Sequence, residues 1–401
     1  MATTPEYDVQ RVRAEVPALA EGLAHFDGPG GTQTPFAVGR AVADTLLSAV
    51  SNRGTVTPSE RRAEEIVAAC RSAIGDLVGT DPGGVIFGRS ATALTYDLSR
   101  ALASTWGAGD EVVVSRLDHD SNVRPWVQAV ERAGATVRWA DFDPATGEQG
   151  LEHFAAVIGE RTRLVALTGA SNLIGTIPPV RAVADLAHEV GGLVWVDGVH
   201  SSAHRLPDRE GVGADFWSCS PYKFLGPHCG TVSADPALLE TLRMDKLVPS
   251  SDAVPERFEL GTLPYELMAG ATAAVNFLAD LVPAEGNRRE RLRASYAALH
   301  DHESVLLARL DTGLREVPGV RVYSNAAERT PTLLFTIDGR DPQAIREHLA
   351  ARGVAAPASH FYAIECSRRL GLGDGGGVRV GLAPYTDGSD VDRLLDGLRE
   401  L

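Results

Sequence analysis

Between residues 111 and 218 the chain alternates short, almost continuously apolar runs with amphipathic helical patterns. Each run has the length of a strand, and the pattern at 179–190 is typical of the helices that separate such strands. Strands that are apolar on both faces belong to parallel sheets that are covered by helices on both sides. We therefore expect a large α/β domain around a mostly parallel sheet. Its strands are predicted at 111–115, 136–140, 164–168, 193–197 and 214–218.

The regions before and after this alternating segment show other patterns of predicted secondary structure. Residues 1–20 are predicted as an N-terminal arm with a short helix, and residues 21–263 as the large domain. After Pro264 long helical stretches reach about Val317. Residues 264–401 are therefore predicted as a long linking helix and a small α+β domain with two helices. The strands of this small domain are expected at 320–323, 332–337 and 378–381.

Two turns early in the chain are suited to ligand binding. The glycine-rich loop at 25–35 lets the backbone approach a ligand closely, with a plain turn as an equal alternative. The segment Gly-Arg-Ser-Ala-Thr at 88–92 follows a short predicted strand at 85–87 and leads into a helix. A helix N-terminus offers N–H groups to an anion, although a serine there also serves simply as a cap. An earlier helix is predicted to begin at Thr57, because Thr-Pro-Ser-Glu is a capping box.

Two polar residues stand at strand ends in the stretch from Val194 to Gly230. Asp197 closes one predicted strand, and Lys223 lies on the turn that follows the strand at 214–218. Ligands of open α/β sheets bind at the carboxyl ends of the strands. A lysine and an acid that converge there indicate a pyridoxal phosphate site, in which the lysine forms a Schiff base and the acid pairs with the pyridinium nitrogen.

The rarity of lysine adds weight to Lys223. The chain has 38 lysines and arginines, and only Lys223 and Lys246 are lysines. Such a chain meets its need for surface cations with arginine, yet it keeps a lysine between Tyr222 and Phe224. Arginine cannot replace a primary amine that must lose its proton. The alternative interpretation is an ordinary solvated lysine on a turn.

The charge and the apolar pattern exclude several classes of partner. A net charge of −15 leaves no basic stripe for nucleic acid and disfavours an anionic membrane surface. No stretch reaches the roughly 18 apolar residues of a membrane span, and the N-terminus lacks the apolar core of a signal peptide, so we expect a cytoplasmic protein. The cysteines have no metal-ligand spacing, so no metal is expected and the thiols are predicted to be free and mostly buried. They are Cys70, Cys219, Cys229 and Cys366.

These residues together resemble a known family. From about Asp27 to the C-terminus the chain is similar to the class V aminotransferase group of fold-type I pyridoxal phosphate enzymes, and within it to the cysteine-desulfurase-like proteins. The most specific pieces are Val-Asp-Gly-Val-His at 196–200 and Ser-Pro-Tyr-Lys-Phe-Leu-Gly-Pro at 220–227. The resemblance implies a large domain with a mixed seven-stranded sheet plus a small α+β C-terminal domain. It also implies pyridoxal 5'-phosphate as cofactor, an α-amino acid as substrate, and a homodimer with shared active sites.

The resemblance assigns catalytic roles to three positions, and Tyr362, where the family is not matched, is a fourth candidate as the second acid of an epimerase. Lys223 would bind the cofactor covalently and then act as the base, and Asp197 would pair with the pyridine nitrogen. His119 would stack on the ring of the cofactor, with a solvated turn histidine as the alternative interpretation. Tyr362 would face the substrate.

Further positions would bind the cofactor and the substrate. Asn172 and His200 would lie near the phenolic oxygen of the cofactor. Each phosphate would be held by Ala91, Thr92, Ser220 and Tyr222 of one chain. Thr262 would reach across to the phosphate that is bound by the neighbouring subunit. Arg379 would bind the substrate carboxylate through its bidentate fork, with an exposed strand arginine as the alternative. Gly30, Gly31 and His360 would line the substrate side, and for His360 and His204 a purely structural role is an equal alternative.

The chain departs from the cysteine desulfurases at one position. These enzymes carry a nucleophilic cysteine on a loop before the carboxylate-binding arginine, and Tyr362 stands at that place. Cys366 follows in a stretch that is predicted to be helical, where a cysteine is more often packed than reactive. The expected reaction is therefore a carbon–sulfur lyase reaction, an α,β-elimination from cysteine or an S-substituted cysteine without the loop nucleophile. The alternatives are an epimerase, with Tyr362 as the second acid, an aminotransferase, and a binding protein that has lost catalysis.

Overall fold

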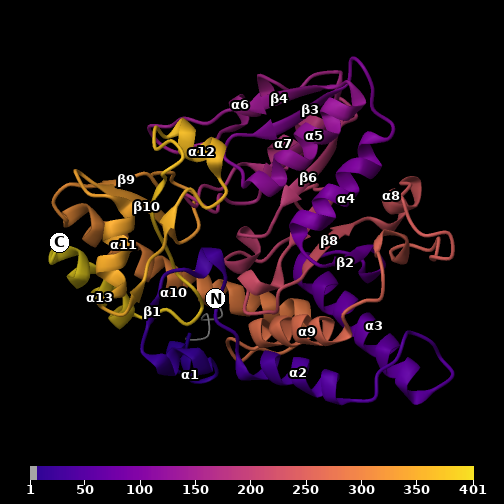
Figure 1. Cartoon of the computed structure of the whole chain (residues 1–401), viewed down its shortest axis with the longest axis horizontal. Coiled ribbons are helices and arrows are strands. Elements are labelled where there is room, and N and C mark those ends of the chain that lie inside the picture. Colours follow the sequence, from indigo (N-terminus) through magenta and orange to yellow (C-terminus); the bar gives the residue numbers. More distant parts are fainter. Residues whose placement is uncertain (1–6) are drawn as a thin grey trace.

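A seven-stranded sheet occupies the larger part of the structure, a computed structural model that describes residues 7–401 (Figure 1). The strand order is β2 (Val85–Gly88), β8 (Gly230–Ala234), β7 (Phe216–Cys219), β6 (Leu193–Asp197), β5 (Thr162–Thr168), β3 (Glu111–Ser115) and β4 (Thr136–Ala140). From β7 to β4 the strands run parallel, and β8 is antiparallel to both of its neighbours. The mixed seven-stranded sheet that the family resemblance implies is confirmed.

The predicted strands of this sheet differ from the observed ones in several respects. Strand β5 begins at Thr162, two residues earlier than expected, and β2 ends one residue later, at Gly88. The strand expected at 214–218 is shifted, because β7 begins at Phe216 and ends at Cys219. Strand β8 was not predicted, since Gly-Thr-Val-Ser-Ala is too small and too polar to give an apolar run. Its five residues are nevertheless all buried in the middle of the sheet. Here burial by the neighbouring strands determines the structure against the local pattern.

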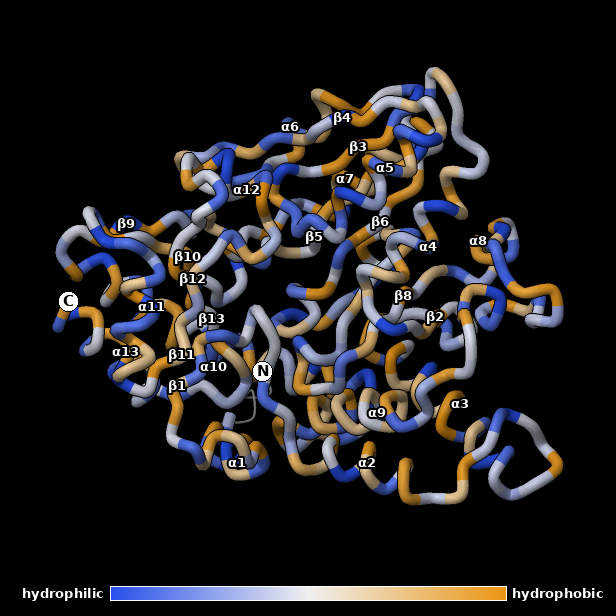
Figure 2. The backbone as a smooth tube through the Cα atoms, viewed as in Figure 1, coloured by the Kyte–Doolittle hydropathy of each residue, from blue (hydrophilic) through white to orange (hydrophobic). Residues whose placement is uncertain are grey.

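Helices cover both faces of this sheet, as the sequence predicts. One core contains side chains of α3 (Pro58–Val78), α6 (Leu151–Ala155), α7 (Val180–Glu189) and α9 (Tyr265–Ala279). The other contains side chains of α4 (Ala91–Ala103), α5 (Arg124–Ala133) and α8 (Pro236–Thr241). Figure 2 shows hydrophobic stretches along the inner strands and in α9. Among the described helices, none is at once long and apolar enough to cross a membrane.

A smaller unit follows the helix α10 (Arg288–Glu316). Its antiparallel sheet has the order β12 (Ala358–Ser359), β13 (Gly377–Gly381), β10 (Thr332–Ile337) and β9 (Val320–Val322). Three helices accompany it, where two were expected: α11 (Pro342–Ala350), α12 (Ile364–Arg369) and α13 (Gly388–Arg399). One of them is the short α12, which carries Cys366 in the stretch that the sequence predicts to be helical.

The N-terminal segment connects the two units. Helix α1 (Val9–Ala14) and helix α2 (Phe36–Leu47) flank the short strand β1 (Ala24–His25). Strand β1 pairs in parallel with β11 (Val354–Ala355) of the smaller unit, whereas α2 packs against α9. The domain boundaries near residues 20 and 263 stay predictions, and residues 1–6 of the predicted arm lie outside the described residues.

Candidate active site

The carboxyl ends of β6 and β7 bring Asp197 and Lys223 to one cleft. The two strands are parallel neighbours, and Asp197 lies in register with Ser218. Lys223 ends a 3₁₀ turn that begins at Pro221, directly after β7. Both side chains line the same narrow cavity. The strand-end geometry that was expected from the sequence is therefore present in the structure.

Lys223 is held as a buried amine next to the glycine-rich loop. Its Nζ donates a hydrogen bond to the carbonyl oxygen of Pro29. Burial and then the nearby Arg379 cation lower the pKa of Lys223 to about 7, while Asp197 acts in the opposite direction. A large share of this amine is therefore uncharged at neutral pH, which is the state in which an amine can attack a carbonyl carbon.

Asp197 is a buried carboxyl group with few partners. Its Oδ1 accepts a hydrogen bond of 2.9 Å from the N–H of Val199. Burial raises the pKa of Asp197 to about 6, although this hydrogen bond and the charge of Lys223 both lower it. Because a buried carboxylate is stabilised by a cation, this side chain suits a protonated ring nitrogen.

His119 lies at the mouth of the cleft, just before the 3₁₀ turn Asp120–Asn122. Its Nδ1 accepts a hydrogen bond of 3.1 Å from the N–H of Ser121. Burial, followed by the charges of Lys223 and Arg379, lowers the pKa of His119 to about 3. The imidazole is thus neutral and can stack on an aromatic ring. Its ring stacks against Tyr362, at 5.5 Å between centroids and 30° between planes.

The start of helix α4 forms the wall of the cleft opposite the lysine turn. Ala91 is its first residue, and the side chain of Ser90 accepts a hydrogen bond from the N–H of Ala93. The first N–H groups of a helix have no intrahelical partner and favour anions. Gly230 makes this approach possible, because a Cβ there would lie 2.2 Å from the backbone nitrogen of Ala91.

The predicted cofactor contacts of one chain lie together around this cleft. Its lining includes Ala91, Thr92, His119, Asn172, Asp197, His200, Ser220, Tyr222 and Lys223. Buried polar atoms normally have hydrogen-bond partners. Yet Asn172 Oδ1, His200 Nδ1 and the neighbouring Arg379 Nε have none in the described structure. These atoms and the helix N-terminus fit a planar, anionic, polar ligand such as pyridoxal phosphate.

Arg379 stands on β13 and reaches the cleft from the smaller unit. It is 2% exposed, and its Nη1 donates a hydrogen bond of 2.9 Å to the carbonyl oxygen of Asn172. Burial lowers the pKa of Arg379 to about 9, against the effects of Asp27 and Tyr222. A Cβ at Gly30 would lie 3.4 Å from Nη2 of Arg379. Gly30 and Arg379 therefore line one side of the pocket together, and the exposed-arginine alternative is wrong.

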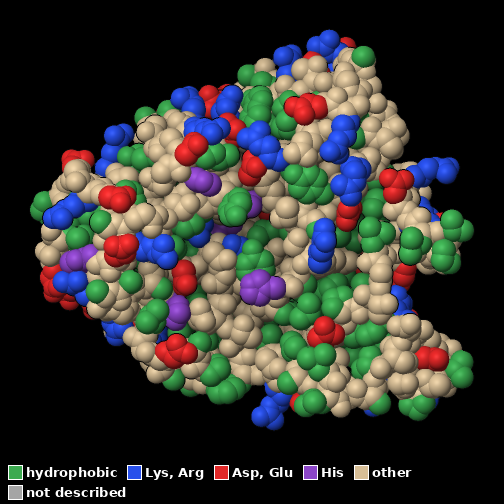
Figure 3. All heavy atoms as spheres, viewed as in Figure 1, with side chains coloured by type: hydrophobic (Ala, Val, Ile, Leu, Met, Phe, Trp, Pro, Cys, Tyr) green, Lys and Arg blue, Asp and Glu red, His purple; other side chains and the backbone are tan. Residues whose placement is uncertain are grey.

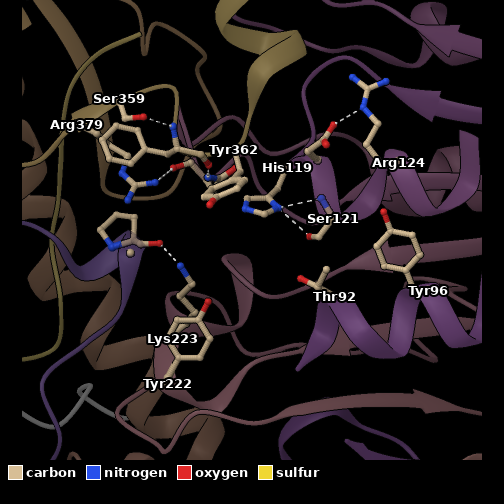
Figure 4. Close-up of a pocket in the computed structure, with 15 residues that line it drawn as sticks. Thr92, Tyr96, His119, Ser121, Arg124, Tyr222, Lys223, Ser359, Tyr362 and Arg379 are labelled. Carbon is tan, nitrogen blue, oxygen red and sulfur yellow. Dashed lines mark hydrogen bonds and ion pairs between the residues drawn. The ribbon is translucent and has the colours of Figure 1, made fainter. Parts of the chain in front are cut away.

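A wider cavity of about 590 Å³ opens in front of the cleft and extends from Pro29 to Tyr96 and Arg124 (Figure 4). The space-filling view shows a hollow near the centre of this face, with histidine side chains along its margin (Figure 3). Sequence reasoning missed seven residues of its lining, namely Pro29, Tyr96, Asp120, Ser121, Arg124, Ser359 and Phe361. Tyr96 was accessible to sequence reasoning, because it follows Thr92 by one helical turn on the same face.

The structure places three predicted residues away from the lining. Gly31 packs against the ring of Tyr222, and His360 lies beside Tyr362, whose N–H donates to His360 Nδ1 at 3.1 Å. Thr262 lines a separate cavity of about 440 Å³. The described chain alone therefore does not bring Thr262 to its own cleft.

The contacts of His204 fit the purely structural role that was the alternative to substrate binding. It is 4% exposed, and its Nδ1 lies 3.0 Å from Oε1 of the buried Glu303 on α10. This pair ties the segment after β6 to the helix that links the two units. The ring of His204 also makes an edge contact with the ring of His200, which lines the cleft.

The four cysteines are free and buried, as expected from the sequence. Burial raises the pKa of Cys70 and of Cys219 to about 12 and raises the pKa of Cys229 and Cys366 as well. Cys366 lies in α12, where it packs with Leu117 and Phe142. None of the four lines the cleft or the wider cavity.

Comparison with known proteins shows the family of the chain. The family model "Aminotransferase class-V" matches residues 24–394. The chain is 35% identical to "Uncharacterized protein MT3887" of Mycobacterium tuberculosis, over 98% of this chain and 99% of that protein. It is 32% identical to a "Probable cysteine desulfurase" of Pseudomonas aeruginosa, over 96% of both chains.

Among solved structures, the cysteine desulfurase CsdA of Escherichia coli shares the fold. It superimposes with a TM-score of 0.86 at 24% identity, over 98% of each chain. The matched family uses pyridoxal 5'-phosphate, which is the group that the cleft fits. The chain therefore belongs to the class V aminotransferase family, as a cysteine-desulfurase-like enzyme whose cofactor is pyridoxal 5'-phosphate.

Proposed function

We propose that the protein is a carbon–sulfur lyase that acts on cysteine or an S-substituted cysteine by α,β-elimination. One observation carries the proposal: Lys223 lines both the narrow cleft, together with Asp197, and the wider cavity, together with Arg379, and none of the four cysteines lines either of them. The names of relatives point to cysteine as a substrate. Transfer of sulfur to the enzyme needs an accessible thiolate, whereas elimination needs only a base and a leaving group.

The residues of the pocket divide the work of such an elimination. Arg379 binds the substrate carboxylate, and the amine of Lys223 accepts the proton from the α-carbon. Asp197 keeps the ring nitrogen of the cofactor protonated, and neutral His119 covers the ring. When bound, pyridoxal phosphate supplies an electron sink for the α-carbanion. The sulfur then leaves as a thiol, and water hydrolyses the remaining enamine to pyruvate and ammonia.

Thr262 and the phosphate site lead us to propose a two-fold dimer with shared sites. Exposed apolar side chains lie close to Thr262 in the sequence, in α2 and the loop that follows it, and in the loop that follows α8. They are Leu46, Leu47, Val56, Leu247, Val248 and Leu260. Exposed apolar groups gathered on a few segments are typical of protein interfaces. In a two-fold dimer Thr262 of each chain would serve the phosphate site of the other.

Mixed dimers test this sharing. Chains with Thr262→Ala and chains with Lys223→Ala are unfolded together, refolded together, and assayed at limiting cofactor. If Thr262 serves the partner, one site of each mixed dimer receives both changes and the other receives neither. We expect activity above the average of the two parent proteins. Activity equal to that average, or a monomer in sedimentation, would contradict shared sites.

The lowered pKa of Lys223 predicts how the rate of cofactor binding depends on pH. Only the uncharged amine attacks an aldehyde, and its fraction increases as pH rises through about 7. The rate of pyridoxal phosphate binding to the cofactor-free protein should rise about tenfold per pH unit below that value and level off above it. Stopped-flow absorbance measures the rate. A rate that continues to rise up to pH 10 would mean that Lys223 keeps the pKa of an ordinary lysine.

Tyr362 favours an epimerase as the second candidate function. Its ring is 70% exposed, lines the pocket, and stacks on His119. An epimerase needs a second acid to return the proton on the face opposite the base. A phenol on the histidine side of the pocket meets that requirement.

One assay separates the two candidates. The enzyme is incubated with cysteine and with S-substituted cysteines, and pyruvate, released thiol and the optical rotation of the remaining substrate are measured. The lyase produces equal amounts of pyruvate and thiol without any added keto acid. Racemised substrate without pyruvate supports the epimerase, and in that case Tyr362→Phe should abolish racemisation.

A further inference from the structure

The contact between Arg379 and Phe361 is a feature of the pocket that the elimination mechanism leaves unexplained. The guanidinium carbon of Arg379 lies 3.7 Å from the ring centroid of Phe361. The other cation–aromatic contacts of the described residues are longer, at 4.8 to 5.1 Å. Arg379 is almost fully buried and forms no ion pair with any carboxylate of the described residues. A buried cation needs compensation, and the negative face of an aromatic ring provides part of it.

The backbone at this contact has an unusual conformation. Phe361 has φ = 49° and Tyr362 has φ = 59°, so two successive aromatic residues lie in the left-handed region. Residues other than glycine rarely adopt this conformation, and where they do, surrounding contacts enforce it. The loop is fixed on both sides, because the carbonyl oxygen of Phe361 accepts from Asn172 Nδ2 at 3.0 Å. The carbonyl oxygen of Tyr362 accepts from the N–H of Asp120 at 2.8 Å.

Asn172 joins the ring and the arginine into one unit. Its side chain holds the carbonyl of Phe361, and its own carbonyl oxygen accepts a hydrogen bond from Arg379 Nη1. The guanidinium is therefore constrained from its face by the ring and from one edge by the peptide. Its Nε is buried and has no hydrogen-bond partner in the described structure. In Figure 4 Arg379 and Ser359 lie on one side of the pocket, above Lys223.

We propose that Phe361 is a positioning residue that holds Arg379 in the orientation that binds the substrate α-carboxylate. The aromatic face orients the fork without neutralising it, whereas a carboxylate in its place would compete with the substrate. The pocket consequently selects amino acids with a free carboxylate over their amides. This inference rests on the proposed function only in taking an α-amino acid as the ligand.

Binding of L-alanine and L-alaninamide to the holoenzyme tests the proposal. The change in the visible absorbance of the cofactor gives both dissociation constants. Phe361→Leu should weaken binding of L-alanine about tenfold, the effect of one desolvated cation–aromatic contact, and binding of L-alaninamide less than about twofold. Phe361→Tyr retains the ring and should stay within about threefold of the wild type for both ligands. Trp139→Leu removes the ring beneath Arg116 outside the pocket and serves as the matched control.

Phe361→Gly separates the ring from the backbone. Glycine adopts the left-handed conformation without strain, so this variant keeps the loop and loses only the ring. It should lose affinity for L-alanine as Phe361→Leu does. Wild-type affinity in the glycine variant, equal weakening for both ligands, or no preference for L-alanine in the wild type would each overturn the proposal. Because binding is read without any product, the result does not depend on whether elimination occurs.

Discussion

Replacing Lys223 with alanine should remove both the visible colour of the protein and its activity. Among the described residues Lys223 is the only lysine that lines the cleft, and burial lowers its pKa to about 7. Without it the cofactor has no covalent attachment and the α-proton has no base. We expect activity to fall by at least about four orders of magnitude. Lys223→Arg should be as inactive, because a guanidinium does not deprotonate.

Lys246 provides a matched control within the same chain. It is the only other lysine, and its Nζ donates to the carbonyl oxygen of Ser250 at 2.9 Å and pairs with Asp252 at 3.0 Å. Lys246→Ala should keep the yellow colour and full activity. Absorbance spectra before and after borohydride reduction give the readout. A coloured, reducible Lys223→Ala protein would remove the basis of the proposed site.

Asp197→Asn should reduce the rate of elimination about 10²- to 10⁴-fold while the protein still binds the cofactor. Asparagine has the same shape and can accept the hydrogen bond from the Val199 N–H. It cannot supply the negative charge that keeps the ring nitrogen protonated, so the cofactor becomes a weaker electron sink. The reduction should appear in kcat, because this interaction strengthens only as charge moves into the ring.

Asp215→Asn is the control for this change. The carboxylate of Asp215 accepts a hydrogen bond of 2.7 Å from the N–H of Val194 and lies 2.9 Å from His188 Nε2. Val194 is at the start of β6, whereas Asp197 is at its end. This variant should lower stability slightly and leave kcat unchanged. Equal kcat values for Asp197→Asn and the wild type would show that the ring nitrogen needs no anion.

The sequence predicts the fold well where side-chain pattern and burial agree. The strands at 111–115, 136–140 and 193–197 have the predicted bounds. The first and third are apolar runs that are buried almost throughout, whereas the strand at 136–140 is an edge strand whose residues are mostly exposed or half-buried. Strand β8 escapes prediction, since its small and polar residues give no local apolar pattern and are buried by the neighbouring strands and by α4. The capping box at Thr57 also forms as predicted, with Thr57 accepting from the N–H of Glu60.

The candidate site is predictable only in part, for a physical reason. Asp197 and Lys223 stand at strand ends, so local patterns locate them. Phe361 has no such signal, because a left-handed aromatic residue results from contacts with Asn172 and Asp120, which are far away in the sequence. The alternation of strands and helices likewise does not predict that Arg379, on β13 of the smaller unit, lines the same pocket as Lys223.

The products formed from cysteine test the central claim most directly. The claim is that the pocket eliminates sulfur without a cysteine nucleophile. Purified holoenzyme is incubated with L-cysteine, and pyruvate, alanine and enzyme-bound sulfur are quantified by mass spectrometry. We predict pyruvate and free sulfide in equal amounts, with no sulfur on any of the four cysteines. Alanine as the main product, together with a persulfide on Cys366 or another cysteine, would contradict the account.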